Sequence, residues 1–233
     1  MDTPLRLVLF DFDGTLCDSA TTIIRLMQQA CGECGLPIPG AEKIRGNIGH
    51  GVSYSALDYV DGDGEKAAML ADCYRRLSRD EYLSGTAPLD PLFPGAKSVL
   101  QALSRQGYLT GIITNKSRTG LQSLIERHGL DTLIDVSLTA DDCAVKPAPD
   151  MALLAMRQMG VDKADTLLVG DTEIDAGCAL NAGIGFIGVS WGYHSPDILR
   201  ERGALSILQE YDSLPDIVHQ HFNSTSTPAS ENR

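Results

Sequence analysis

Two aspartates, Asp11 and Asp13, follow a short apolar run near the start of the 233-residue chain, in the segment DFDGT. Residues two apart in extended backbone point to the same side, so both carboxylates would face one space. Two carboxylates this close repel each other unless a cation or a proton relieves the repulsion. A solvated turn that caps the next helix is the alternative. It would explain Gly14 and Thr15, but not the polar groups that follow later runs.

Three further residues could contact a phosphate. Thr114 and Asn115 end a strand-like run and can donate hydrogen bonds to a phosphoryl oxygen, although this pair is also an ordinary helix start. Lys146 lies in the sequence VKPAP, where two prolines stiffen the loop just before a helical stretch. A lysine in such a loop is a better candidate for a positioned charge than a freely solvated one.

Asp171 and Asp175 follow another strand-like run, at residues 166–169. Their spacing of four puts them on one face if a helix begins there. As charges at a helix N-terminus they would need no further explanation. Together with Asp11, however, they form a set of oxygen ligands suited to a hard cation.

The elements that must position these residues alternate between strand and helix. Strand-like runs occur at residues 5–10, 109–113, 134–138, 166–169 and 184–189. Amphipathic helical patterns occur between them, at residues 96–105, 121–128, 151–159 and 174–182. This alternation predicts the α/β class, with a parallel sheet covered by helices on both faces. Ligands bind such sheets at the carboxyl ends of the strands, where the polar residues lie.

One interval lacks strand-like runs. From about residue 19 to about residue 84 the patterns are helical, at 22–32, 52–60 and 65–83, and a proline-rich stretch at 86–95 leads back. We therefore expect a helical cap at 19–85, large enough to act as a lid, and a core made of 1–18 and 86–222. Residues 223–233 lack apolar side chains to bury, and we expect them to be disordered.

Taken in order, the segments DFDGTL, Thr114-Asn115, KPAP and GDTEID resemble the four motifs of the haloacid dehalogenase superfamily of phosphohydrolases. The resemblance runs from Leu5 to about Tyr193 and is specific as a set. It implies a Rossmann-like, doubly wound core with a helical cap after the first strand, as in the phosphoglycolate phosphatase-like branch. The WGY tract at 191–193 is also similar to one common in this branch, and we interpret it as packing.

The resemblance implies roles for the motif residues. Asp11 would attack phosphorus and form an aspartyl phosphate. Asp13 would protonate the leaving oxygen and then take a proton from the hydrolytic water. Thr114, with Asn115 nearby, would hold the phosphoryl group, and Lys146 would offset charge between nucleophile and phosphate.

The resemblance also implies a magnesium site. Mg²⁺ would be bound by the Asp11 carboxylate, the Asp13 backbone carbonyl and Asp171, with Asp175 supporting it directly or through water. A cation is required on physical grounds too, because an aspartate anion should not approach a phosphate dianion unaided.

Substrate choice would depend on the cap. Arg45 matches an arginine of the phosphoglycolate phosphatases and could grip a carboxylate, although a solvated arginine is the alternative. His50 is a weaker candidate in the same segment, and Lys116 and Arg118 could add positive field near Thr114. The resembled dehalogenases lack an aspartate at the position of Asp13, which argues against dehalogenation.

Composition limits the partners. The formal net charge is −12, which argues against nucleic acid as a partner. The same charge means that the expected substrate, a small phosphorylated metabolite, would have to be attracted by cations near the site. No apolar run approaches the ~20 residues needed to span a bilayer, and no export signal is visible. The six cysteines are scattered, as in a reducing cytoplasm, and the close pair Cys31 and Cys34 reads as thiols at a helix end. We expect a cytoplasmic monomer or homodimer.

The leading hypothesis is a Mg²⁺-dependent phosphomonoester hydrolase, with 2-phosphoglycolate as the best guess for its substrate. A phosphomutase of sugar phosphates is the alternative, since the same motifs support intramolecular transfer if a lid excludes water. A non-catalytic phosphate-binding protein is the third hypothesis, against which the complete motif set argues.

Overall fold

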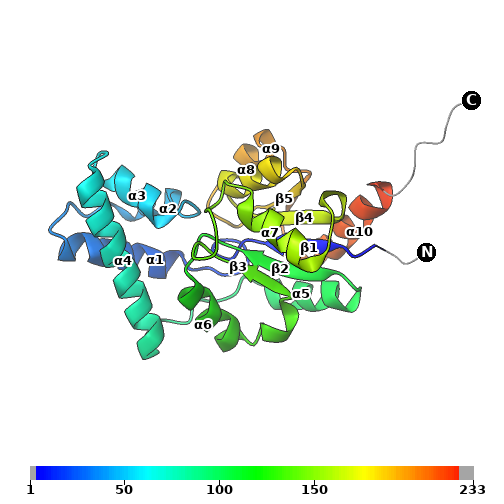
Figure 1. Cartoon of the computed structure of the whole chain (residues 1–233), viewed down its shortest axis with the longest axis horizontal. Helices are drawn as coiled ribbons and strands as arrows, with labels where there is room; N and C mark the ends of the chain where they lie inside the picture. Colours follow the sequence, from blue (N-terminus) through cyan, green and yellow to red (C-terminus); the bar gives the residue numbers. More distant parts are fainter. Residues whose placement is uncertain (1–3, 226–233) are drawn as a thin grey trace, which may run out of the picture.

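A computed structural model describes residues 4–225 of the chain. Its centre is one parallel sheet with the strand order β3-β2-β1-β4-β5-β6. The strands are β1 (Leu7–Phe10), β2 (Leu109–Ile113), β3 (Val136–Leu138), β4 (Thr166–Gly170), β5 (Gly185–Val189) and β6 (Ser206–Leu208). Figure 1 shows helices on both sides of this sheet and a separate helical group at one end. The predicted α/β class is confirmed.

Four core helices lie close to their predicted positions: α5 (Ala96–Arg105), α6 (Arg118–His128), α7 (Asp150–Met159) and α8 (Glu173–Ala182). The sequence patterns missed α9 (Pro196–Glu201), α10 (Leu214–Thr225) and the edge strand β6. A strand of three residues such as β6 is too short for alternation to become visible, and its pairing with β5 depends on the tertiary fold.

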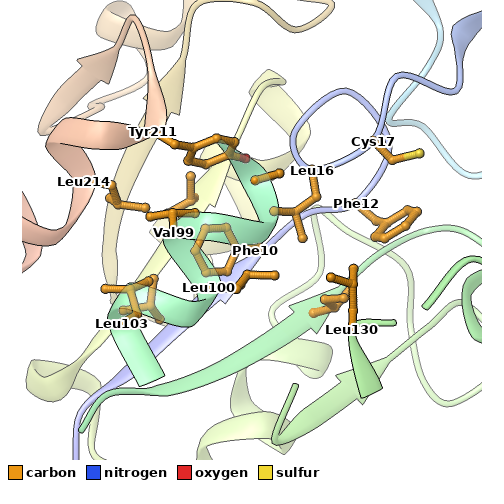
Figure 2. Close-up of a cluster of buried hydrophobic side chains, with 14 of the residues drawn as sticks. Phe10, Phe12, Leu16, Cys17, Val99, Leu100, Leu103, Leu130, Tyr211 and Leu214 are labelled. Carbon is orange, nitrogen blue, oxygen red and sulfur yellow. The ribbon is translucent and has the colours of Figure 1, made fainter. Parts of the chain in front are cut away.

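The two faces of β1 are buried in two different hydrophobic clusters. Val8 and Phe10 belong to the cluster that includes α5, α6 and α10, whereas Leu7 and Leu9 belong to the cluster that includes α7 and α8. All four side chains are fully buried, as expected for a central strand of a parallel sheet. Figure 2 shows Phe10 against α5, with Phe12 and Leu16 continuing the same cluster beyond the end of β1.

Helices α1 (Ala20–Glu33), α2 (Ala41–Gly46), α3 (Val52–Tyr59) and α4 (Gly64–Ser84) form the separate group, which we call the helical insertion. No strand occurs in this described interval, as predicted, although the short helix α2 was not anticipated. The helices share a third hydrophobic cluster, in which Leu26, Ile44 and Leu70 are almost completely buried. The insertion therefore has an apolar core of its own.

The chain leaves the core and returns to it along two adjacent segments. The Asp18 amide donates to the Pro91 carbonyl oxygen at 2.8 Å, and Cys17 and Leu92 form an antiparallel bridge. The outgoing and returning segments are thus tied together at the base of the insertion.

The C-terminal helix differs from expectation. Helix α10 extends to Thr225, so it includes the first three residues of the segment 223–233 that we expected to be disordered. Apolar residues before this segment explain the continuation, because Val218 and Phe222 are fully buried against the core. Residues 226–233 lie outside the described part of the chain. Within that part, no helix meets the length and apolarity that a membrane span requires, and Cys31 and Cys34 are free thiols near the end of α1.

Candidate active site

The candidate site lies at the carboxyl ends of three adjacent strands. Because β1 is paired with β2 on one side and with β4 on the other, Asp11, Thr114 and Asp171 all emerge at the same edge of the sheet. The Asp11 amide donates to the Val169 carbonyl oxygen at 2.9 Å, which continues the β1–β4 pairing up to the aspartate itself. Backbone pairing therefore positions these side chains before any side-chain contact is made.

Asp11 and Lys146 form a buried ion pair. Lys146 Nζ lies 2.8 Å from Oδ1 of Asp11, and both residues are at most 3% exposed. The Phe12 amide also donates to Oδ1, at 2.7 Å. Burial raises the pKa of Asp11 to about 7, although Lys146 acts to lower it.

Lys146 is shared between two carboxylates. Its Nζ also donates to Oδ1 of Asp175 at 2.6 Å. Burial acts to lower the pKa of Lys146, but the ion pairs with Asp11 and Asp175 outweigh it and raise the pKa. Asp175 also belongs to a capping box at the start of α8, because its Oδ2 accepts from the amide and the hydroxyl of Thr172. The side chain of Asp175 therefore orients the lysine and caps the helix at once.

Asp171 is fixed by contacts from two distant segments. Thr15 Oγ1 donates to its Oδ1 at 2.8 Å, and the Tyr193 amide donates to its Oδ2 at 2.9 Å. Gly14 and Gly192 lie so close that a Cβ on either would come within 2.3 Å of an Asp171 atom. The tract at 191–193, interpreted from sequence as packing, thus also holds a carboxylate in place.

Asp11, Asp171 and Asp175 form one acidic cluster, with an oxygen from each lying within 4.8 Å of the others. Burial, followed by repulsion from Asp175 and Asp11, raises the pKa of Asp171 well above its ordinary value. Burial and mutual repulsion disfavour the ionised form of these carboxylates, and a hard divalent cation would stabilise that form. The residues present therefore fit a magnesium ion.

Asp13 points away from that cluster. Its carboxylate accepts from Ser19 Oγ at 2.6 Å and from Lys116 Nζ at 3.1 Å. Burial acts to lower the pKa of Lys116, but Asp13 and the neighbouring Tyr82 and Tyr74 outweigh it and raise the pKa well above its ordinary value. Lys116, expected only to add positive field, is thus a direct partner of Asp13.

Thr114 and Asn115 have different surroundings. Thr114 is 1% exposed, and its Oγ1 lies at the floor of the site, accepting from the Lys116 amide at 3.3 Å. The side-chain amide of Asn115 donates to the carbonyl oxygens of Gly49 and Lys146, at 2.9 and 3.0 Å. Both hydrogens of that amide are therefore donated to main-chain oxygens. In this structure the Asn115 side chain connects two loops and has no amide hydrogen left for a phosphate.

A cavity of about 650 Å³ opens above these residues, between the core and the helical insertion. Asp11, Asp13, Thr114 and Lys146 line its floor, and His50 lines its wall. The ring of His50 stacks on that of Tyr54 with centroids 4.3 Å apart, and burial lowers the pKa of this histidine.

Arg45, predicted to bind a substrate carboxylate, is not among the residues that line this cavity. It lies exposed on α2 and places its guanidinium 5.9 Å from the centre of the Tyr193 ring. Arg118 is likewise turned elsewhere, toward Ser137 and Asp142. The arginines that do line the cavity are Arg75 and Arg79 on α4. The spacing of four residues between them indicated that both arginines would lie on one face of a helix. Nothing in the sequence indicated which face of α4 would turn toward the site.

Comparisons with known proteins place the chain in a family. A model of the haloacid dehalogenase-like hydrolase family matches residues 8–189. The probable phosphatase IndB of Dickeya dadantii is 32% identical over 96% of this chain and 98% of its own length. A phosphoglycolate phosphatase of Cupriavidus necator is 30% identical over 92% of this chain and 94% of its own length.

A solved structure of a haloacid dehalogenase-like hydrolase from Bacteroides fragilis superposes with a TM-score of 0.81 at 25% identity, covering 90% of this chain and 99% of that one. The family match and the full-length relatives confirm the superfamily and the phosphatase class predicted from the motifs. The chain therefore belongs to the haloacid dehalogenase-like hydrolase family, and within it to the phosphatases.

Proposed function

We propose that the protein hydrolyses small phosphomonoesters in a Mg²⁺-dependent reaction that passes through an aspartyl phosphate on Asp11. One observation carries this proposal: the Asp11 carboxylate lies 2.8 Å from Lys146 Nζ, beside two further buried carboxylates, at the floor of an open cavity. A nucleophilic carboxylate needs this setting, because positive charge must offset the repulsion between it and the phosphate.

Asp11 is the nucleophile in this scheme. Its Oδ1 is held by Lys146 and by the Phe12 amide, so the other oxygen, Oδ2, is the one to bond to phosphorus. The Asp11 Oδ2–phosphorus bond forms as the bond from phosphorus to the leaving oxygen breaks. Thr114 would bind the phosphoryl group through its hydroxyl, and Lys146 would offset negative charge beside the attacking carboxylate.

Asp13 is the acid and base. It would give its proton to the leaving oxygen and then take one from the water that attacks the aspartyl phosphate, which releases inorganic phosphate and restores Asp11. Ser19 and Lys116 hold the carboxylate in one position for both steps.

Magnesium would be held by Asp11 and Asp171 and by the Asp13 backbone carbonyl, with Asp175 supporting it. When bound, Mg²⁺ supplies positive charge for the phosphate oxygens and for the crowded carboxylates. We further propose that residues 19–85 act as a cap over the core formed by 1–18 and 86–222. The cavity between the two supports this assignment.

The test is phosphate release from a panel of phosphomonoesters, 2-phosphoglycolate among them, with Mg²⁺ and with a chelator. We expect turnover with Mg²⁺ only, and none in Asp11→Asn. Wild-type-like turnover in that variant would refute Asp11 as the nucleophile. Isomerised sugar phosphate with little free phosphate would instead favour a phosphomutase. Ligand binding without any turnover would favour a phosphate-binding protein.

A further inference from the structure

The cavity above the catalytic floor is large for a two-carbon acid. Its volume of about 650 Å³ lies within the range of roughly 300–1,000 Å³ that is typical of pockets for drug-sized ligands. A phosphate on Asp11 would occupy one end of it. The rest of the cavity is available to the organic part of the substrate.

Much of the wall around that space is apolar or aromatic. Ile23 and Met27 contribute to it from α1, Tyr54 and Tyr59 from α3, and Tyr74 from α4. The stacked rings of His50 and Tyr54, inclined by only 14°, add a flat surface, and Tyr54 is 58% exposed and so open to contact. Flat aromatic surfaces favour a planar partner through stacking.

Among the residues that the structure describes, the lysines at the floor of the cavity, Lys116 and Lys146, are both already paired with carboxylates, so neither is spare for a second anionic group of the substrate. Lys146 is shared by Asp11 and Asp175, and Lys116 is paired with Asp13. Arg45, the residue expected to bind a substrate carboxylate, is not part of the cavity wall.

Two arginines of α4 supply the missing charge. Arg75 and Arg79 both line the cavity one helical turn apart. Arg75 is partly committed, since it donates to Ser53 at 2.7 Å and to Asp72 at 2.9 Å. Arg79 is less restricted: its only ion pair among the described residues is a 3.8 Å contact with Asp80, and its side chain is 59% exposed. A guanidinium with free donors is well suited to bidentate binding of a carboxylate.

We propose that this cavity selects phosphomonoesters with a planar aromatic body that carries a carboxylate distal to the phosphate, and that Arg79, assisted by Arg75, binds that carboxylate. This proposal rests on the proposed phosphatase function and names the class of its substrate. In the bound state the phosphate lies on the floor, the ring lies along the aromatic wall and the carboxylate reaches α4.

Three substrates separate the parts of the proposal: 4-carboxyphenyl phosphate, phenyl phosphate and 2-phosphoglycolate. With wild-type protein and Mg²⁺, we expect kcat/KM for 4-carboxyphenyl phosphate to exceed both others about ten-fold or more. Arg79→Gln should lower that value about ten-fold, the size expected for one charge-assisted hydrogen bond, and leave phenyl phosphate within about two-fold. Arg76→Gln is the matched control, because Arg76 lies on the same helix as Arg79 but pairs with Glu33 of α1 and does not line the cavity.

Each part of the proposal has a result that would overturn it. Equal effects of Arg79→Gln on the two aryl phosphates would overturn the carboxylate site. A preference for 2-phosphoglycolate over both aryl phosphates would overturn the aromatic body. If no phosphate is released from any of the three substrates, the proposed function fails. Calorimetric titration then tests whether the cavity still binds a distal carboxylate. 4-Carboxybenzylphosphonate should bind about ten-fold tighter than benzylphosphonate to wild type but not to Arg79→Gln. Equal binding of the two phosphonates would overturn the proposal.

Discussion

Asn115 contacts both main-chain groups of Lys146. The Lys146 amide donates to Oδ1 of Asn115 at 2.9 Å, and Nδ2 of Asn115 donates to the Lys146 carbonyl oxygen at 3.0 Å. The same Nδ2 reaches the Gly49 carbonyl oxygen of the helical insertion at 2.9 Å. One side chain therefore connects the loop of the buried lysine to the loop that overhangs the cavity.

Replacing that amide with a carboxylate tests this connection. In Asn115→Asp the side chain keeps its acceptors but loses both donated hydrogen bonds, and it faces two carbonyl oxygens. We expect kcat to fall about 10- to 100-fold, because each buried group left without a partner costs about 1–3 kcal/mol and the Lys146 loop can shift. Steady-state kinetics on any accepted substrate would measure this.

Asn181→Asp is the control for that variant. Asn181 donates to the Pro147 carbonyl oxygen at 2.9 Å, next to Lys146, but does not line the cavity. A similar loss of kcat in both variants would show that general loosening of the loop, and not the Asn115 connection, is responsible.

Gly49 also approaches the core beside Thr172. Its φ of +101° is unfavourable for other residues, and a Cβ there would lie 2.8 Å from Cγ2 of Thr172. Gly49→Ala should therefore push this loop away from the core and raise KM about ten-fold, at a strain of about 1–3 kcal/mol. Gly46→Ala serves for comparison, since a Cβ there meets open space, and we expect no loss of activity from it. An unchanged KM in Gly49→Ala would show that the loop does not contribute to substrate binding.

Lys116 should be needed to position Asp13. In Lys116→Met the Asp13 carboxylate keeps Ser19 but loses its cation, and we expect kcat to fall about ten-fold or more, because a charge-assisted hydrogen bond that holds the carboxylate in place is lost. Arg118→Gln removes a charge two residues away that pairs with Asp142 instead, so its kcat should match wild type. A kcat that is unchanged in Lys116→Met would exclude the proposed positioning role.

The acidic cluster should make stability depend on pH when no metal is present. Asp11 has a pKa of about 7 in the folded chain against an ordinary value of 3.8, so the folded state binds the proton more tightly than the unfolded state. Between these values the free energy of unfolding should therefore fall as the pH rises, through the contribution of this group. Urea unfolding in chelator from pH 4.5 to pH 8 measures the slope.

Two comparisons identify the origin of that slope. Asp11→Asn should make it shallower, and saturating Mg²⁺ should raise the stability of wild type most at the upper end of the range. Equal slopes in wild type and in Asp11→Asn would mean that other groups dominate.

The floor of the candidate site was largely predictable, because its residues follow buried strands and parallel pairing brings strand ends together. Asp11, Thr114 and Asp171 needed only that argument. Lys146 lies in a loop, where hydrophobic periodicity gives no information. The motif around it indicated that it belongs to the site. The contacts between segments were not predictable: nothing in the spacing of Ser19 or Lys116 marks either as a partner of Asp13.

The cavity wall was harder to predict for a physical reason. Helices of the insertion bury one face against each other, and the face that turns toward the core is set by packing in three dimensions. Arg45 and Arg79 are both exposed arginines on helices of the insertion, yet only Arg79 lines the cavity. Arg45 was chosen from motif similarity alone, which cannot give the rotation of a short helix.

The adjacent exit and return of the chain at Cys17 and Leu92 has an evolutionary consequence. The helical insertion is one continuous stretch of the chain, while the strand ends that bear Asp11 and the rest of the acidic cluster lie outside it. Exchange of that stretch between related genes, or mutation confined to it, could therefore produce enzymes with new specificities from one inherited reaction.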